Sequence, residues 1–472
     1  DKSAPNTTHS LSSDKPKNGD WYVADVTVTL HPTDVGPSGI DVTYYSVDGS
    51  PEVPGTSLVL DTDGEHTVEY YSVDKAGNKQ APQTISLKID KTAPTTKAEL
   101  VPEYPNGDND WYTVPVLVQL TAEDNINGSG VAKTYLSTDR VNWHEGTTIS
   151  IETNGQHTVY FYSVDVAGNV EETQWVEFKI DRTAPVTSVV LDPAVADGEN
   201  GWYKSPVKLT FTVSDEGGSG VAETSYSRDG TSYTTGLSVV IDTDGEHTIW
   251  YRSTDGAGNA EEPKSVSFKI DQTKPEWNAE GVSAVRTLGS ILELDLAARA
   301  SDATSGVASV SATLNGVPWD GSATVLTQPG NNILVVTVKD YAGNVYTTGE
   351  LNIPVHYVFS GFEDYTRVIK RGSTVPFKFK VTDEAGVAQP DAFVTKMEIR
   401  LLNENGEIGE YFIEPIDCAG KSNPDGVWRY SKEDNQYIFN WKTSKTEQLG
   451  TYRVTIWLND GSEHHLILKL GK

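Results

Sequence analysis

Aspartates recur at three places in a repeating pattern, and this pattern points to metal chemistry. One aspartate stands shortly before a Ser-Gly pair, at Asp34, Asp124, Asp215 and Asp302. A second begins an Asp-x-Ala-Gly-Asn segment, at Asp74, Asp165, Asp255 and Asp340. The third lies at a recurring Ile-Asp-x-Thr joint, at Asp90, Asp181 and Asp271, with Asp1 at the equivalent place. Carboxylates that meet repel one another unless a proton or cation intervenes. Calcium is a hard ion that takes six to eight oxygen ligands, so it would suit them.

A simpler interpretation of the same aspartates stays open. Each side chain can hydrogen-bond the backbone of its own loop, as aspartate often does in turns. A bound ion must raise the melting temperature by mass action, whereas turn residues respond to neither calcium nor a chelator.

Other reactive groups do not form a catalytic pattern in this sequence. We find no His-Glu-x-x-His, no Gly-x-Ser-x-Gly and no phosphate-binding glycine loop. His66, His157 and His247 recur once in each repeat, as structural residues do, and His464 and His465 would point to opposite faces of a strand. We therefore expect a protein that is not an enzyme.

The elements that position the aspartates belong to internal repeats. Trp-Tyr recurs at Trp21, Trp111 and Trp202, and Ala-Gly-Asn recurs at Ala76, Ala167, Ala257 and Ala342. These markers predict four repeats over residues 1–90, 91–181, 182–271 and, in a divergent form, 272–355. Residues 356–472 break the pattern and form a fifth domain.

Each repeat has the period-two alternation of β-strands. Val26, Val28 and Leu30 alternate with threonines, and Val68 and Tyr70 line a second strand, while Asp-Gly and Asn-Gly pairs mark the turns between strands. About seven short strands in each repeat predict an all-β fold of tandem immunoglobulin-like sandwiches, in an elongated array with short joints. A distinct all-β domain follows, with strands expected over 375–381, 437–441, 452–458 and 465–470.

This topology predicts which aspartates meet. In such a sandwich the loop between the second and third strands and the loop between the last two strands lie at one end, where the incoming linker also arrives. Three carboxylates per repeat should therefore gather, for instance Asp90, Asp124 and Asp165. The turn of the preceding repeat, with Asp61 and Asp63, should face the same joint.

Charge and composition exclude some classes of partner. The chain has 472 residues and a formal net charge of −30. Nucleic acids and anionic membrane surfaces need a basic footprint, so neither is expected as a partner. No apolar run reaches the roughly 18 residues of a membrane span. Cys418 is the single cysteine, so no disulfide forms within the chain.

Two segments resemble known families. The block from His66 to Asn78 resembles the immunoglobulin-like repeat of bacterial secreted and surface proteins, which accompanies adhesins, surface-layer proteins and secreted polysaccharide-degrading enzymes. Giant adhesins with similar repeats are thought to stiffen their joints with calcium, so the resemblance also implies calcium here. Residues 356–472 are similar to the PxKF domain, through Pro376 to Phe379, Tyr437 to Thr443 and Leu458 to Gly461.

The combined evidence predicts a non-catalytic, extracellular stalk of a larger bacterial secreted or cell-surface protein, of adhesin or surface-layer type. Its partner would be a cell-surface or extracellular glycan or protein, or further copies by self-assembly. The alternative is an accessory, carbohydrate-binding region of a secreted polysaccharide-degrading enzyme. Aromatic residues that would stack on sugars, unless they belong to the core, are Trp250, Tyr160, Tyr162, Tyr71, Trp428, Trp441 and Trp457.

Overall fold

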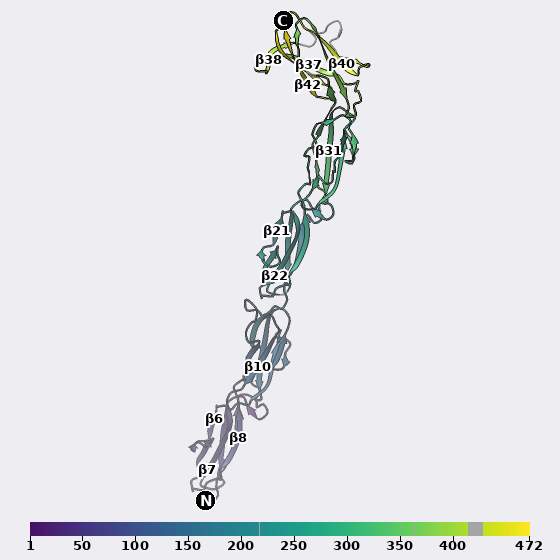
Figure 1. The fold of residues 1–472 in the computed structure, drawn as a ribbon. Helices are drawn as coiled ribbons and strands as arrows, with labels where there is room; N and C mark the ends of the chain where they lie inside the picture. The colour runs from purple at the N-terminus through teal and green to yellow at the C-terminus, as the bar shows by residue number, and fades with distance from the viewer. Residues whose placement is uncertain (217, 363, 414–427) are drawn as a thin grey trace. The chain divides into compact units, whose positions relative to one another are not determined.

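The computed structural model describes residues 1–216, 218–362, 364–413 and 428–472. Within these ranges every regular element is a β-strand, and the ribbon is strands and loops from the N-terminus to the C-terminus (Figure 1). The all-β prediction is therefore confirmed. No helix of this part of the chain has the length and apolarity to cross a membrane. Cys418 lies outside the described residues.

The described chain divides into two compact units. One comprises residues 1–190, 210–239 and 249–266, and the other comprises residues 191–209, 240–248 and 267–472. The ranges predicted from the sequence, 1–90, 91–181, 182–271, 272–355 and 356–472, name the five segments of the chain.

The first repeat, residues 1–90, forms two sheets with strand orders β1-β3-β6 and β2-β8-β7-β4-β5. The alternation in the sequence predicts its core correctly, because Val26, Val28 and Leu30 are buried with Val68 and Tyr70. The strands are β1 (Asn6–Ser13), β2 (Trp21–Tyr22), β3 (Val26–Thr33), β4 (Ile40–Val47), β5 (Val53–Pro54), β6 (Ser57–Leu60), β7 (Gly64–Asp74) and β8 (Gln83–Ile89).

The second repeat has sheets of order β13-β10-β9 and β12-β11-β14-β15. Its core is equivalent to that of the first repeat, with Val116, Val118 and Leu120 packed with Val159 and Phe161. The strands are β9 (Thr95–Val101), β10 (Val116–Glu123), β11 (Val131–Ser137), β12 (His144–Glu145), β13 (Thr148–Ile151), β14 (Gly155–Asp165) and β15 (Gln174–Ile180).

The third repeat has sheets of order β16-β18-β21 and β17-β23-β22-β19-β20. The Trp-Tyr pair forms the short strand β17, which runs parallel to the last strand of the repeat, with Trp202 opposite Lys269. The strands are β16 (Val186–Asp192), β17 (Trp202–Tyr203), β18 (Val207–Ser214), β19 (Val221–Ser227), β20 (Thr234–Thr235), β21 (Ser238–Ile241), β22 (Gly245–Asp255) and β23 (Lys264–Ile270).

The fourth repeat keeps one full sheet, β25-β33-β31-β28-β29 with β32 beside β31, and two short pairs, β24-β27 and β26-β30. Leu334, Val336 and Val338 form its core strand and are fully buried. The strands are β24 (Glu276–Trp277), β25 (Arg286–Thr287), β26 (Ile291–Leu292), β27 (Ala300–Ser301), β28 (Val307–Leu314), β29 (Val317–Trp319), β30 (Thr324–Val325), β31 (Gly330–Asp340), β32 (Val345–Thr347) and β33 (Leu351–His356).

The last domain has sheets of order β34-β36-β40-β39 and β35-β42-β41-β37-β38. All four strands expected from its sequence are present, as β36, β40, β41 and β42. Aromatic residues dominate its core, with Phe377, Phe439, Trp441 and Tyr452 fully buried. The strands are β34 (Val358–Ser360), β35 (Val368–Lys370), β36 (Thr374–Thr382), β37 (Val394–Leu402), β38 (Ile408–Ile413), β39 (Arg429–Ser431), β40 (Gln436–Lys442), β41 (Gly450–Leu458) and β42 (Glu463–Gly471).

Candidate metal centres at the repeat ends

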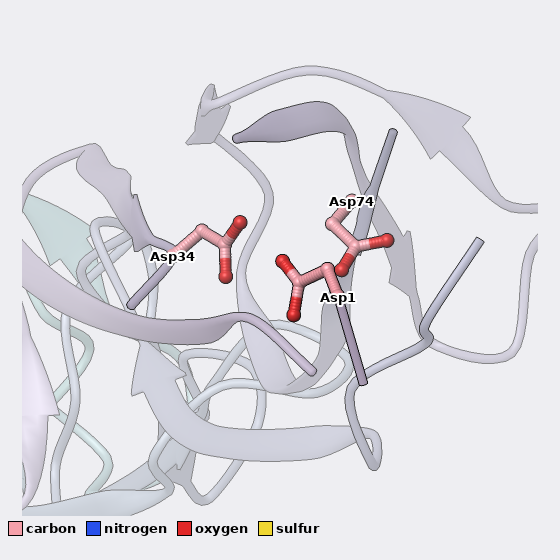
Figure 2. A group of neighbouring side chains, drawn as sticks. All are labelled: Asp1, Asp34 and Asp74. Atoms are coloured by element: carbon pink, nitrogen blue, oxygen red, sulfur yellow. The ribbon is translucent and has the colours of Figure 1, made fainter. Parts of the chain in front are cut away.

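The predicted aspartates meet in threes, once in each of the four repeats. In each group the carboxylate oxygens lie within 4.8 Å of one another. Figure 2 shows the first group, with the carboxylates of Asp1, Asp34 and Asp74 gathered from three separate segments of the chain. The groups are Asp1, Asp34 and Asp74; Asp90, Asp124 and Asp165; Asp181, Asp215 and Asp255; and Asp271, Asp302 and Asp340.

Strand ends bring the three carboxylates of a group together, as the second group illustrates. Asp124 directly follows β10, Asp165 is the last residue of β14, and Asp90 directly follows β8. An irregularity in the pairing of β11 with β14, between Val131 and Lys133, lies next to Asp165. The same irregularity recurs in the other three repeats, so each site has the same backbone frame.

Hydrogen bonds hold each carboxylate in its loop. Asp124 accepts from the N–H of Gly130 at 2.6 Å, and Asp90 accepts from the N–H of Ser129 at 2.7 Å. Asp165 accepts from both the backbone N–H and the side-chain amide of Asn169, each at 2.8 Å. The aspartates are thus turn residues, as the simpler interpretation expects, and they also meet, as the metal hypothesis requires.

Burial and the proximity of the carboxylates raise the pKa of one aspartate in each of the second, third and fourth groups. Burial raises the pKa of Asp165, and the neighbouring charge of Asp90 raises it further. Burial likewise raises the pKa of Asp271, with the charges of Asp302 and Asp340 adding to the effect. In the third group burial raises the pKa of Asp215, and the other two carboxylates of its group also contribute.

Two buried oxygen atoms in these groups have no hydrogen-bond partner within the described part of the chain. They are Oδ2 of Asp340 and Oδ1 of Asp215. Asp340 is fully buried, so its unpaired oxygen is withdrawn from water as well. A buried charged oxygen without a partner is costly, because nothing replaces its lost hydration. A cation bound by the three carboxylates would supply that missing partner.

The donor set fits a hard cation. The side chains that meet are all carboxylates, without sulfur or imidazole, and such oxygen ligands suit calcium, magnesium or manganese rather than zinc. Calcium tolerates irregular coordination and can take its remaining ligands from backbone carbonyls and water, whereas magnesium demands a near-ideal octahedron. Among these ions, calcium matches the loops best.

The first group is more open than the others. Asp1 is exposed, and its Oδ2 accepts from the hydroxyl of Ser38 at 2.7 Å. Although burial raises the pKa of Asp74, hydrogen bonds from Asn78 outweigh that effect and the pKa is lowered. Repulsion is therefore a weaker influence here than in the second, third and fourth groups.

Two further predictions about the repeat ends are supported. Asp63 accepts from the N–H of Lys91 at 2.9 Å and from the side-chain amide of Asn125 at 3.0 Å, so this turn does face the joint. His157 and His247 each bond, through Nε2, a backbone carbonyl four residues earlier, at 2.7 Å. These contacts fit the structural role expected of the recurring histidines.

Four of the aromatic candidates for sugar binding are buried or partly buried. Trp441 is fully buried, so it is a core residue, and Trp428 is partly buried and packs on the ring of Phe379 at 4.8 Å. Trp457 is partly buried, with the ammonium of Lys396 over its ring at 4.6 Å. Tyr71 is also buried.

Two of the predicted candidates, Tyr160 and Tyr162, lie with further aromatic residues on the outer face of one sheet of the second repeat. Tyr162 stacks on Tyr135 at 5.2 Å and contacts Trp143 at 4.7 Å. Tyr160 lies opposite Trp175, whose exposed fraction is 60%. Sequence reasoning missed Tyr135, Trp143 and Trp175, because only the strand register shows that they share a face.

Comparisons with known proteins give similarities of fold and no family. No family model and no curated protein matches the chain. Among solved structures, a tetra-tandem repeat in the extending region of a large adhesion protein is 12% identical, covering 99% of this chain and 100% of that one, with a TM-score of 0.24. A 1.5-MDa bacterial ice-binding adhesin is 14% identical, covering 58% of this chain and 100% of that one, with a TM-score of 0.24. Fibronectin(III)-like modules of Clostridium thermocellum CbhA are 10% identical, covering 36% and 94%, with a TM-score of 0.19. At this level of similarity none of these matches bears on function.

Proposed function

We propose that this chain is a non-catalytic spacer of an extracellular bacterial protein, of adhesin or surface-layer type, whose repeats are joined through calcium ions. One observation carries the proposal: the same three-aspartate group recurs in all four repeats, and each group includes the aspartate of the incoming linker. A catalytic centre normally occurs once in a chain, whereas a structural device recurs with its repeat.

The chemistry of the site explains how an ion would act on a joint. Asp90 belongs to the linker, while Asp124 and Asp165 belong to loops of the second repeat. An ion that binds all three ties the linker to the repeat that follows it. Without the ion, mutual repulsion of the three carboxylates opposes the same arrangement. Calcium would therefore restrict the motion of each linker.

Solution scattering and melting with and without calcium test the proposal together. A single globule of this length has a radius of gyration of about 23 Å, and an extended array must exceed that value by a wide margin. We expect the larger radius, a higher melting temperature in calcium, and up to four bound ions per chain, one for each group. A compact particle contradicts the spacer role, and an unchanged melting temperature contradicts the calcium sites.

A second candidate function is glycan binding by an accessory region of a polysaccharide-degrading enzyme. The aromatic face of the second repeat favours it, because exposed rings stack on the apolar faces of sugars. The first and third repeats carry Thr84 and Ser265 where the second carries Trp175. Retention on insoluble polysaccharides that Trp175→Ser abolishes would support this function, and no retention of the unaltered chain would exclude it.

The last domain and the location of the protein belong to the same proposal. We assign residues 356–472 to the PxKF type on its sequence motifs, with an aromatic core that accommodates Phe377 and Phe379 of the motif. An acidic chain with recurrent calcium sites suits the space outside a bacterial cell, where the ion is plentiful. Partners would then be surface glycans, surface proteins or further copies of the chain.

A further inference from the structure

The loop that precedes Trp-Tyr in each of the first three repeats contacts the Ala-Gly-Asn turn of the following repeat. In the second repeat, the N–H of Asp108 donates to the carbonyl of Ala257 at 2.9 Å. The side-chain amide of Asn109 donates to the carbonyl of Gly256 at 2.8 Å. We call residues 106–110 and their equivalents the pre-Trp loop.

The same contact recurs further along the chain with other residues. In the third repeat the N–H of Glu199 donates to the carbonyl of Ala342 at 2.8 Å, and the amide of Asn200 donates to the carbonyl of Tyr341 at 2.8 Å. The shorter loop of the first repeat makes one bond, from the amide of Asn18 to the carbonyl of Ala167 at 2.9 Å. The acceptor is the alanine of Ala-Gly-Asn in all three cases.

Glycines on both sides allow the close approach. A Cβ atom at Gly107 would lie 2.6 Å from the carbonyl oxygen of Ala257, and one at Gly198 would lie 2.6 Å from that of Ala342. On the acceptor side, a Cβ atom at Gly168 would lie 2.6 Å from the amide nitrogen of Asn18. Real Cβ atoms do not approach other atoms so closely, so only glycine permits this contact without a shift.

Hydrogen bonds within its own repeat fix the conformation of the pre-Trp loop. In the second repeat the N–H of Gly107 bonds the carbonyl of Trp111 at 3.0 Å, and Asn106 exchanges two bonds with Thr113. Asn109 and Asp110 have positive φ, which these residue types tolerate better than most. A preorganised loop loses little entropy when it docks.

We propose that the pre-Trp loop and the Ala-Gly-Asn turn form a second tie between neighbouring repeats, made by hydrogen bonds and independent of any cation. This inference deepens the proposed spacer role and rests on it. Since the linker and the pre-Trp loop reach the next repeat at separate points, together they restrict rotation about the joint, which one point of attachment would leave free.

The acceptor surface also defines a partner. Ala76, Gly77 and Asn78 of the first repeat form the same turn, and Gly77 has the same positive φ as its equivalents. Its matching partner is a pre-Trp loop of the sequence type found at Gly107 to Asn109 or Gly198 to Asn200, from another repeat of this kind.

Distance measurements between spin labels test the tie in the full chain. Labels on Thr148→Cys and Ser238→Cys, in a chain whose own cysteine is replaced by serine, report on the second and third repeats. Labels on Ser238→Cys and Thr327→Cys report on the third and fourth. All three positions are exposed. We expect Gly107→Ala to broaden only the first distance distribution and Gly198→Ala to broaden only the second, in calcium and in chelator alike.

A gentler variant keeps the result interpretable if a glycine substitution disturbs folding. Asn109→Asp keeps the size and the tolerance of positive φ but removes the amide donor. We expect a broader first distribution and, for the N–H of Asp108, hydrogen exchange that is roughly 2–10-fold faster, the usual value of one hydrogen bond. Gly146→Ala is the control in the same repeat, because a Cβ atom there would meet only the side chain of Leu136 at 4.0 Å, and it should change neither quantity.

Unchanged distributions in Gly107→Ala and Asn109→Asp, with the large radius of gyration retained, would overturn the tie and leave the spacer role intact. Broadening that appears only in chelator would also overturn it, because the tie would then depend on the ion. A compact particle would contradict the spacer role itself.

Discussion

The joints between the repeats and the joint before the last domain hold their linkers in different ways. Between repeats, a linker aspartate such as Asp271 meets two further carboxylates. Before the last domain, a single aspartate suffices: Asp460 accepts from the N–H of Tyr357 at 2.6 Å and from the N–H of Ser462 at 2.9 Å. In the described part of the last domain no group of three acidic side chains meets.

Other contacts of the last joint are a ring stack and a backbone hydrogen bond. The ring of Phe359 stacks on that of His464 at 3.6 Å, and the N–H of Glu384 donates to the carbonyl of Leu288 at 2.7 Å. The charge of the buried Asp460 is stabilised by the hydrogen bonds that it accepts. The comparison teaches that a sandwich can hold its linker either with saturated hydrogen bonds or with unbalanced carboxylates. On the calcium proposal, only the second type would make the joint responsive to the surrounding medium.

The largest effect should come from the core of the last domain. Trp441→Ala removes a fully buried ring and should lower the free energy of unfolding of this domain by about 3–5 kcal/mol. Calorimetry should show the transition of this domain shifted down, with the calcium response of the repeats unchanged. A loss of that response would mean that the two regions are not independent.

Calcium should stabilise the repeats and leave the stability of the last domain unchanged. At a free concentration of one hundred times the dissociation constant, a bound ion stabilises its site by about 2.7 kcal/mol. We expect the transitions of the repeats to rise in calcium relative to chelator while that of the last domain stays in place. Equal shifts everywhere would point to a general salt effect and contradict specific sites.

A matched pair of substitutions sharpens the contrast at single residues. Asp340→Asn should lower the calcium response of the fourth repeat, since this carboxylate has an unpaired oxygen in its group. Asp460→Asn should lower the stability of the last domain by about 1–3 kcal/mol with or without calcium, because it weakens buried hydrogen bonds. Melting each variant in both media checks this, and a calcium-dependent effect of Asp460→Asn would contradict the distinction.

The smallest effect should be a dependence on pH. The pKa values of Asp165, Asp215 and Asp271 are raised in the folded chain, so the folded state holds more protons than the unfolded one. In chelator, stability should therefore fall as the pH rises through these raised values, so melting temperatures of the repeats should be higher on the acidic side of this titration than on its alkaline side. In calcium the trend should weaken or reverse, since protons compete with the ion. A pH trend identical in both media would contradict an ion at these aspartates.

Much of this structure follows from local signals in the sequence. Asp48 and Gly49 lie between the paired strands β4 and β5 and adopt positive φ, as a hairpin turn predicts, whereas Asp63 and Gly64 join β6 to β7, which belong to different sheets. The period-two pattern identifies the core strands, and sandwich topology brings together the aspartates of each group as predicted. These features succeed because each depends on a short segment or on the order of strands.

The sequence did not predict the features that depend on the pairing register of the strands. Ser72 reads as a polar position, yet it is fully buried and joins Thr7 at 2.7 Å and Thr43 at 2.8 Å. Equivalent hydroxyl groups meet in the second and third repeats. The sequence alone does not reveal which threonine lies opposite which serine, and the same uncertainty hid the aromatic face of the second repeat and the docking of the pre-Trp loop.

Each joint is built from residues of two neighbouring repeats, and this arrangement bears on how the number of repeats can change. The second repeat, for example, contributes Asp181 and its pre-Trp loop to the joint that follows, and Asp124, Asp165 and an Ala-Gly-Asn turn to the joint that precedes. Every such repeat therefore has one end that supplies the linker aspartate and the pre-Trp loop, and another end that supplies the two loop aspartates and the Ala-Gly-Asn turn. Successive Trp-Tyr pairs lie 90 and 91 residues apart (111 − 21 and 202 − 111), so a duplication or deletion of one period by recombination restores a matching joint. The proposed joints would then allow the array to lengthen or shorten by whole repeats.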